Sequence, residues 1–312
     1  MAPNYNGLMR DPETQTELDS SMVQALIRGN HSLVEAILKR GGNPNAKAVS
    51  KRGEKGSPAL ELALFMASDV RFKLVGALMA YGADPNNSEF LNTTLDPRVS
   101  PFMRACMRND EMSAGAMLDS SGPVKVNLLA RDNNGWLPSM AVIDSSPAFL
   151  SKLQSFFERE TMPAHPELKR DHLWSCVDNN GKNSAMLCIG RPASLQWLCS
   201  QEYIDFPGLI NTKDTSSGET ALWAAAKQQN KTSVDFLLTH GADATILNSK
   251  GESLVSYLEG LCSSDLQLNR HLPSQLVSIK NSVKATAASQ MALASIEEML
   301  EKVIVRGPGM GH

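Results

Sequence analysis

The sequence predicts an all-helical protein, a solenoid built from stacked pairs of short helices. The clearest pair lies at 218–243, which reads GETALWAAAKQQNKTSVDFLLTHGAD. Its first half is rich in alanines that let a second helix approach closely, and its second half places Val234, Leu237 and Leu238 on one helical face. Two helices this short bury too little apolar surface to be stable alone. We therefore expect further copies on both sides of this pair.

Capping residues predict where the two helices of 218–243 begin and end. Thr220 is expected to cap a first helix that runs to about Gln229, because its hydroxyl can accept a hydrogen bond from a free amide of the first turn. The second helix is expected over 232–239. Gly241 is expected to end it by adopting the left-handed conformation.

The same stretch resembles an ankyrin repeat. The letters of the family's T-P-L-H-x-A signature and of its exit turn fall on Thr220, Ala221, Leu222, Trp223, Ala225 and 241–243. The resemblance implies an ankyrin array that binds other proteins through a concave face, made of first-helix surfaces and the β-hairpin-like fingers between repeats.

Composition excludes several classes of protein. With 42% hydrophobic residues in 312, the chain can bury a continuous core. A net charge of −3 gives no basic field for nucleic acid. Five cysteines without a C-x-x-C pair favour a reducing compartment, and no apolar run is long enough to span a membrane. We expect a monomeric protein that is cytoplasmic where it is made and holds no metal or cofactor.

Further copies of the helix pair are recognised along the chain. Residues 1–17 are rich in turn formers and predict a flexible lead. Residues 18–261 are expected to form about six degenerate repeats, whose segments are 20–45, 57–86, 100–127, 132–159, 178–198 and 214–243. Lys47 to Lys55 is placed where a finger would project, and D-x-x-G turns at 132–135 and 178–181 precede first helices.

The segment 262–306 differs in kind from the repeats. Two apolar stripes at helical spacing occur in it, formed by Leu276, Ile279 and Val283 and by Ala292, Ile296, Met299 and Val303. We expect a helical pair that covers the apolar end of the array. The glycines and proline at 307–309 stop it, and 307–312 is expected to be a flexible tail.

One set of residues falls on the variable surface positions of the predicted array. These candidates for partner binding are Lys47, Arg104, Arg108, Asn134, Trp136, Asn180, Glu219, Trp223, Lys227 and Gln228. Tryptophan and arginine are the types that dominate binding energy at interfaces. Trp136 is the favoured contact. For Trp223 the alternative is that it packs between neighbouring helices.

A catalytic interpretation is the main alternative to a binding module. The connection 161–172 is unusually long, and His172 and Cys176 could form a Cys–His pair or, with Cys188 and Cys199, a metal site. Their spacing matches no zinc signature, and no nucleotide-binding, metalloprotease or hydrolase motif occurs. We therefore expect no catalysis. A pocket at 161–188 that holds His172 and Cys176 within hydrogen-bond reach would favour an enzyme.

The acidic stretch at 297–301 bears on whether the protein is exported from the cell that makes it. It is similar to the glutamate-rich C-terminal signal of bacterial type IV secretion effectors, many of which carry ankyrin repeats. This resemblance implies a virulence effector that is delivered into a host cell and binds a host protein. The plainer alternative is a solvated helix face in which Glu298 pairs with Lys302. A regulatory or scaffold subunit acting inside its own cell is a third interpretation.

Overall fold

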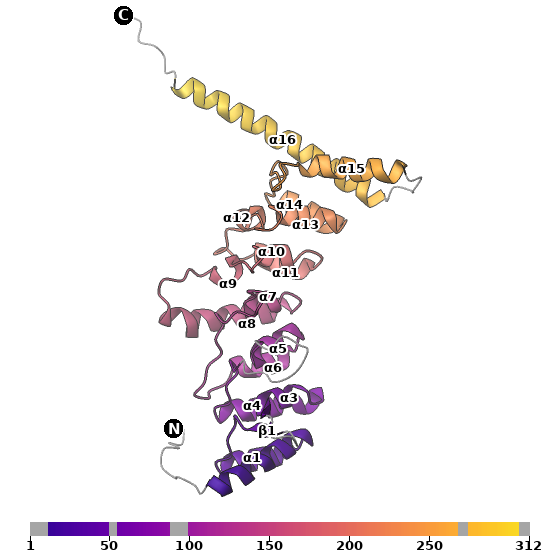
Figure 1. Cartoon of the computed structure of the whole chain (residues 1–312). Helices are drawn as coiled ribbons and strands as arrows, with labels where there is room; N and C mark the ends of the chain where they lie inside the picture. Colours follow the sequence, from indigo (N-terminus) through magenta and orange to yellow (C-terminus); the bar gives the residue numbers. More distant parts are fainter. Residues whose placement is uncertain (1–11, 50–54, 88–98, 268–273, 306–312) are drawn as a thin grey trace, which may run out of the picture. The chain divides into compact units, whose positions relative to one another are not determined.

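The computed structural model describes residues 12–49, 55–87, 99–267 and 274–305 (Figure 1). The chain divides into two compact units, 1–168 and 169–312. We call them unit 1 and unit 2 and describe each by itself. The predicted all-helical fold of stacked helix pairs is confirmed in both.

Unit 1 is built from two rows of helices. Its elements are α1 (Pro12–Ile27), α2 (His31–Lys39), β1 (Lys47–Val49), β2 (Lys55–Pro58), α3 (Ala59–Leu64), α4 (Ser68–Ala80), α5 (Pro101–Met107), α6 (Glu111–Leu118), α7 (Pro138–Ala141) and α8 (Pro147–Phe156). The first helices of the repeats, α1, α3, α5 and α7, pack one against the next, and so do the second helices α2, α4, α6 and α8. A π-helical turn and a 3-10 turn, Phe157–Thr161 and Met162–Ala164, continue from α8.

Unit 2 contains the second set of helices. They are α9 (His172–Ser175), α10 (Ser184–Leu187), α11 (Pro192–Cys199), α12 (Phe206–Asn211), α13 (Ala221–Lys227), α14 (Lys231–Thr239), α15 (Leu254–Gln267) and α16 (Ser274–Val305). Helix α10 packs against α9, α12 and α13, and α16 packs against both α14 and α15. Each pair gains its apolar core from its neighbours, as the short helices require.

The start of the array departs from the sequence-based boundary. Helix α1 begins at Pro12, so 12–17 of the expected flexible lead are helical, whereas 1–11 lie outside the described residues. Proline is favoured in the first turn of a helix because its missing amide would have no partner there. The base of the expected finger is present, because β1 and β2 pair as antiparallel strands with Lys47 opposite Pro58; residues 50–54 of the finger lie outside the described residues.

The helices of the clearest repeat end close to where capping residues place them. Asn230 caps α14, because its Oδ1 accepts a hydrogen bond from the amide of Ser233 at 3.0 Å. Gly241 adopts the predicted left-handed conformation, with φ +93°. Thr220 lies at the N-cap of α13, but its hydroxyl is buried and makes no cap hydrogen bond. The role predicted for that hydroxyl is therefore wrong.

Asparagine side chains tie successive exit turns together. In unit 1 the Oδ1 of Asn45 accepts from the amide of Asp84 at 2.8 Å, and its Nδ2 donates to the carbonyl of Gly82 at 3.1 Å. Asn211 in unit 2 makes the same two contacts with Asp243 and Gly241. These bonds satisfy backbone groups that the helix ends leave without partners.

The C-terminal cap has a different construction from the predicted one. Both apolar stripes lie on the single helix α16, and the helical pair consists of α15 and α16. The first stripe is buried. Of the second stripe, Ala292 and Ile296 are exposed, and the side chains of Met299 and Val303 lie outside the described residues. Gln290 bonds to both Ala242 and Ala244, after which α16 leaves its neighbours.

Within the described residues, no helix combines the length and apolar character that a bilayer span needs.

Candidate protein-binding surface

Turns that precede the first helices are built on one acidic or amide side chain each. The Oδ1 of Asp178 accepts hydrogen bonds from the amides of Asn180 and Lys182, at 2.8 and 2.9 Å. Asp132, Asp214 and Asn248 bond to their own turns in the same way. Gly181 supplies the left-handed residue of its turn, with φ +77°. Such turns hold the side chains beside them in fixed positions.

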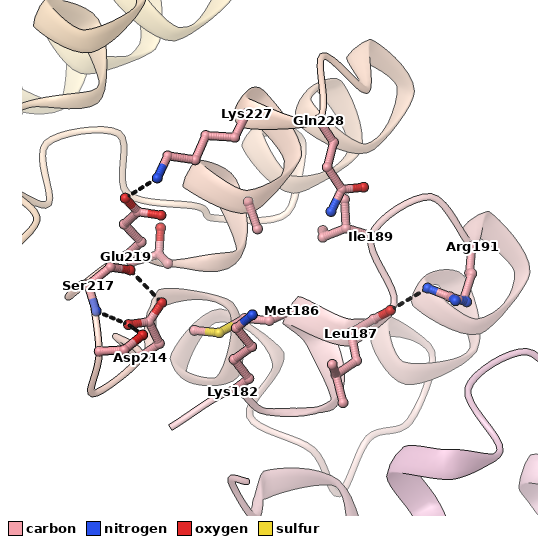
Figure 2. A pocket seen from close by; sticks show the side chains of 13 residues that line it. Lys182, Met186, Leu187, Ile189, Arg191, Asp214, Ser217, Glu219, Lys227 and Gln228 are labelled. Carbon is pink, nitrogen blue, oxygen red and sulfur yellow. Dashed lines mark hydrogen bonds and ion pairs between the residues drawn. The ribbon is translucent and has the colours of Figure 1, made fainter. Parts of the chain in front are cut away.

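A groove of about 420 Å³ lies in unit 2 where the repeats of α10 and α13 meet (Figure 2). Apolar side chains of both repeats line it, including Met186 and Leu187 within α10 and Ala224 within α13. Lys182, Arg191, Lys227 and Gln228 line it with polar ends. A surface that combines apolar contacts with many polar groups suits a segment of another protein.

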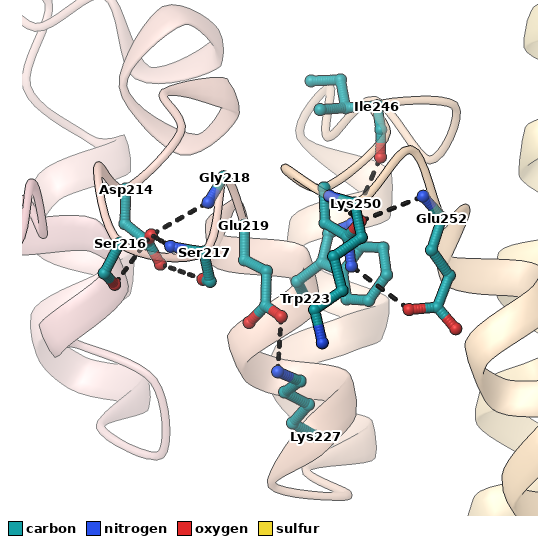
Figure 3. Close-up of polar contacts among 11 residues, drawn as sticks. Asp214, Ser216, Ser217, Gly218, Glu219, Trp223, Lys227, Ile246, Lys250 and Glu252 are labelled. Carbon is teal, nitrogen blue, oxygen red and sulfur yellow. Dashed lines mark hydrogen bonds and ion pairs between the residues drawn. The ribbon is translucent and has the colours of Figure 1, made fainter.

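The two acidic residues of the groove are already engaged. Glu219 pairs with Lys227, and Asp214 accepts hydrogen bonds from Ser217, Ser216 and Gly218 (Figure 3). Burial opposes ionisation of Asp214, but these hydrogen bonds outweigh it and hold the pKa of its carboxyl below the ordinary value.

Two cations, Lys182 and Arg191, also line the groove. Lys182 is exposed, and its ammonium makes no hydrogen bond or ion pair within the described part of the chain. Arg191 donates from Nη1 to the carbonyl of Leu187 at 2.8 Å, which fixes the guanidinium at the rim. The groove therefore presents positive charge beside apolar side chains.

Trp223 is a core residue, so its place among the surface candidates is corrected. Its side chain is only 1% exposed, and its ring centroid lies 5.6 Å from that of Tyr257 on α15. Its Nε1 donates to the carbonyl of Ile246 at 3.2 Å (Figure 3). The alternative, packing between neighbouring helices, holds because this position of the first helix faces the next repeat.

Arg104 is also corrected, because it is mostly buried. Its side chain is 12% exposed, and its Nε donates to Oε1 of the fully buried Glu61 at 3.0 Å. The pair joins α5 to α3 within the core of unit 1. Arg108, one turn further on, is exposed and remains a candidate: its guanidinium carbon lies 4.8 Å from the ring centroid of Phe65.

The remaining candidates occupy separate places. Glu219, Lys227 and Gln228 meet in the unit 2 groove. Asn180 is exposed at its turn, outside the lining of that groove. In unit 1, Asn134 is exposed, whereas Trp136 and Lys47 are half-buried.

Sequence reasoning missed the two cations that define the groove, Lys182 and Arg191. A signal for both was present. Lys182 directly follows the turn glycine of the fifth repeat, and Arg191 lies in its shortened middle, Gly190-Arg191-Pro192. Both positions border a first helix, where array surfaces are exposed.

His172 and Cys176 are in contact, as the catalytic alternative suggested, but they do not belong to the groove. His172 Nε2 lies 3.5 Å from Cys176 Sγ across one turn of α9, and neither residue lines the groove described above. Among the described residues, no group of three His, Cys, Asp or Glu could hold a metal ion. Cys106 and Cys188 are buried, as expected of small core residues, and burial raises the pKa of the Cys106 thiol.

Comparisons with known proteins agree with this geometry. Residues 217–249 match the family model of the ankyrin repeat. The chain is also similar to the crystal structure of the ankyrin repeat domain of Bcl-3, a unique member of the IkappaB protein family. That match has a TM-score of 0.54 and 16% sequence identity, and it covers 83% of this chain and 96% of the Bcl-3 chain. No curated protein sequence matches this one. The fold is that of an ankyrin array, which is typical of protein-interaction modules.

Proposed function

We propose that this ankyrin array binds another protein, and that the groove between the repeats of α10 and α13 is a main contact. One observation carries the proposal: Lys182 and Arg191 border a groove that contains apolar side chains and whose own acids are already engaged. A partner segment with a carboxylate next to an apolar side chain fits this surface, because the carboxylate meets cations and the apolar group leaves water.

Affinity capture with mass spectrometry tests the proposal. The full chain is used as bait in a eukaryotic lysate, beside the double variant Lys182→Glu/Arg191→Glu. The control is Lys250→Glu, which reverses an exposed lysine that does not line the groove. A partner should be retained by the wild type and the control and lost by the double variant. Retention by all three baits would refute a contact at this groove.

We further propose that the chain is an effector, made in a bacterial cytoplasm and delivered into a host cell, where it acts as a monomer on a host protein. The support is the acidic segment at 297–301, of which Glu297 and Glu298 are exposed on α16. A fusion to a host-activated reporter enzyme tests delivery from a donor with a type IV secretion system. Removing 296–312 should abolish the signal. Export of the truncated chain would refute the role of the acidic segment as the signal. If the intact chain is not exported, a regulatory subunit of its own cell is favoured.

The proposed binding needs no catalysis by this chain. The contact between His172 and Cys176 is the one observation that favours an enzyme with a site at 161–188. Cys176→Ser should leave partner capture, and the state of the captured partner, unchanged. A covalent change in the partner that depends on Cys176 would instead establish the catalytic alternative.

A further inference from the structure

Three neighbouring first helices of unit 1 end in an exposed apolar side chain. Ile27 ends α1, Phe65 follows α3 and Met107 ends α5, and they are 59%, 51% and 49% exposed. Each directly follows two buried core residues, namely Ala25-Leu26, Ala63-Leu64 and Ala105-Cys106. The three positions are therefore equivalent, and because α1 packs on α3 and α3 on α5, they form a row. We call Ile27, Phe65 and Met107 the apolar column.

Folding does not require apolar residues at this position. In unit 2 the equivalent residue after Ala225-Ala226 is Lys227, an exposed lysine that pairs with Glu219. Single exposed apolar side chains are common on protein surfaces, but a contiguous group of large ones marks a binding site. Stability of the stacked repeats therefore does not explain the apolar column, and binding of a ligand would.

Two arginines lie beside the apolar column, and one acid, the exposed Asp144 that follows Val142-Ile143 in the repeat of α7, occupies the next position of the row. Arg28 and Arg108 directly follow Ile27 and Met107, and both are exposed. Two acids of the same helix pairs are engaged elsewhere, since Glu61 is buried against Arg104 and Asp110 accepts from Nη1 of Arg71 at 2.7 Å. An acidic partner is favoured by this arrangement.

The spacing of the apolar column indicates a helix as its ligand. Packed helix axes lie about 8–10 Å apart, and an α-helix presents the same face every seven residues, a rise of about 10.5 Å. In a β-strand the nearest match is three residues, about 10 Å, which falls on the opposite face of the strand. Met107 and the half-buried Met66 add adaptable side chains of the kind that receive amphipathic helices.

We propose that the apolar column, with Arg28 and Arg108, binds an acidic amphipathic helix with apolar residues at i, i+7 and i+14. The inference rests on the proposed function as an interaction module and adds to it a second contact of different chemistry, within unit 1. Burial of the half-exposed Ile27, Phe65 and Met107 supplies the attraction, and carboxylates that flank the apolar ridge of the ligand meet the two arginines.

A display library of random 20-residue peptides, selected on the immobilised full chain, tests the inference. Enriched peptides should carry apolar residues at seven-residue spacing with Asp or Glu beside them. Their affinity, measured by fluorescence anisotropy, should fall at least tenfold in Phe65→Asp and in Met107→Asp. Leu33→Asp and Met112→Asp are matched controls, because both residues are exposed apolar side chains on second helices, and both should bind as the wild type does.

Several outcomes would overturn the inference. They are the absence of enriched peptides, enrichment of a three-residue polyproline spacing, binding that survives both column variants, and equal losses in the control variants. Circular dichroism checks that every variant is folded. Lys182→Glu/Arg191→Glu separates the two proposals: it should abolish partner capture at the groove of unit 2 while leaving the selected peptides bound to unit 1.

Discussion

Replacing Arg104 by methionine should destabilise unit 1 strongly at neutral pH and only weakly in mild acid. Glu61 on α3 is fully buried, and its Oε1 accepts from the Nε of Arg104 on α5 at 3.0 Å. Burial raises the pKa of Glu61 above its ordinary value, although Arg104 opposes this rise. Loss of Arg104 would leave the Glu61 carboxylate buried without its counter-charge.

The expected size follows from the burial of both side chains, 0% and 12% exposed. Breaking a buried ion pair by removing one partner costs about 3–5 kcal/mol. This is a large share of the free energy of unfolding of a typical domain, which is about 5–15 kcal/mol. The Oε2 of Glu61 has no hydrogen-bond partner within the described residues, so the pair is incompletely satisfied. The double variant Glu61→Leu/Arg104→Met should therefore be about as stable as the wild type.

The pH dependence has a definite sign. A raised pKa means that folded Glu61 holds its proton more tightly than the unfolded chain does. Its contribution to stability is full below the unfolded value of about 4.5 and is lost as pH rises through the folded value. In Arg104→Met this loss should be larger, so the cost of the substitution should grow from mild acid to neutral pH. The double variant should lack this dependence.

Urea unfolding followed by far-ultraviolet circular dichroism, repeated across pH, measures these free energies. Arg28→Met is the control, because Arg28 is exposed and is not among the charges that act on Glu61, and its replacement should cost less than about 1 kcal/mol. A cost for Arg104→Met that is small, or equal at every pH, would refute the assignment of Arg104 to the core.

Three further predictions concern the turns and the cap. Gly181→Ala should destabilise the chain more than Gly251→Ala in thermal unfolding: both glycines have positive φ, but an added Cβ at Gly181 would lie 2.4 Å from the amide nitrogen of Thr215, whereas Gly251 has open space. The strain of the left-handed conformation alone should cost Gly251→Ala about 1–2 kcal/mol. Because the pKa of Asp214 is lowered on folding, its carboxylate stabilises the folded chain above about pH 3.8, and this contribution is lost in stronger acid. Asp214→Ala should remove the contribution, which acid titration of the circular dichroism signal would measure. Ending the chain after Gln290 should barely change the melting temperature, whereas Gln290→Ala should cost about 1–3 kcal/mol because it removes two hydrogen bonds to the preceding repeat.

Local signals in the sequence were enough to predict the repeats. The D-x-x-G turns, the apolar spacing of Val234 and Leu237 and the left-handed Gly241 depend on residues within a few positions of one another. The structure places all of them as the pattern indicates. Local chemistry also located Glu219, Lys227 and Gln228 on one surface, because they lie on a single short helix and the turn before it.

Burial of individual side chains was beyond local reasoning. Trp223 and Arg104 occupy first-helix positions that a single repeat leaves open, and each is covered by a residue far away in the sequence, Tyr257 and Glu61. The prediction that the second apolar stripe of α16 would be covered also failed, here because a neighbour was expected and is missing among the described residues. Periodicity identifies the apolar face of a helix, as at Ile296, but the presence of a neighbour to cover that face depends on where the stack ends.

Each first helix has buried positions that pack against the next repeat and exposed positions that do not. This separation lets one fold carry different binding chemistry. Small residues such as Ala63 and Ala225 are buried wherever a repeat stacks, so packing leaves little choice there. Two positions later the side chain is exposed and packing does not restrict it, and the chain has Phe65 in one repeat and Lys227 in another. Since folding accepts either residue, we expect the proposed contacts with partners, and not packing, to decide the choice at this position. Substitutions there should therefore change binding with little effect on unfolding, and substitutions at the alanines should do the reverse.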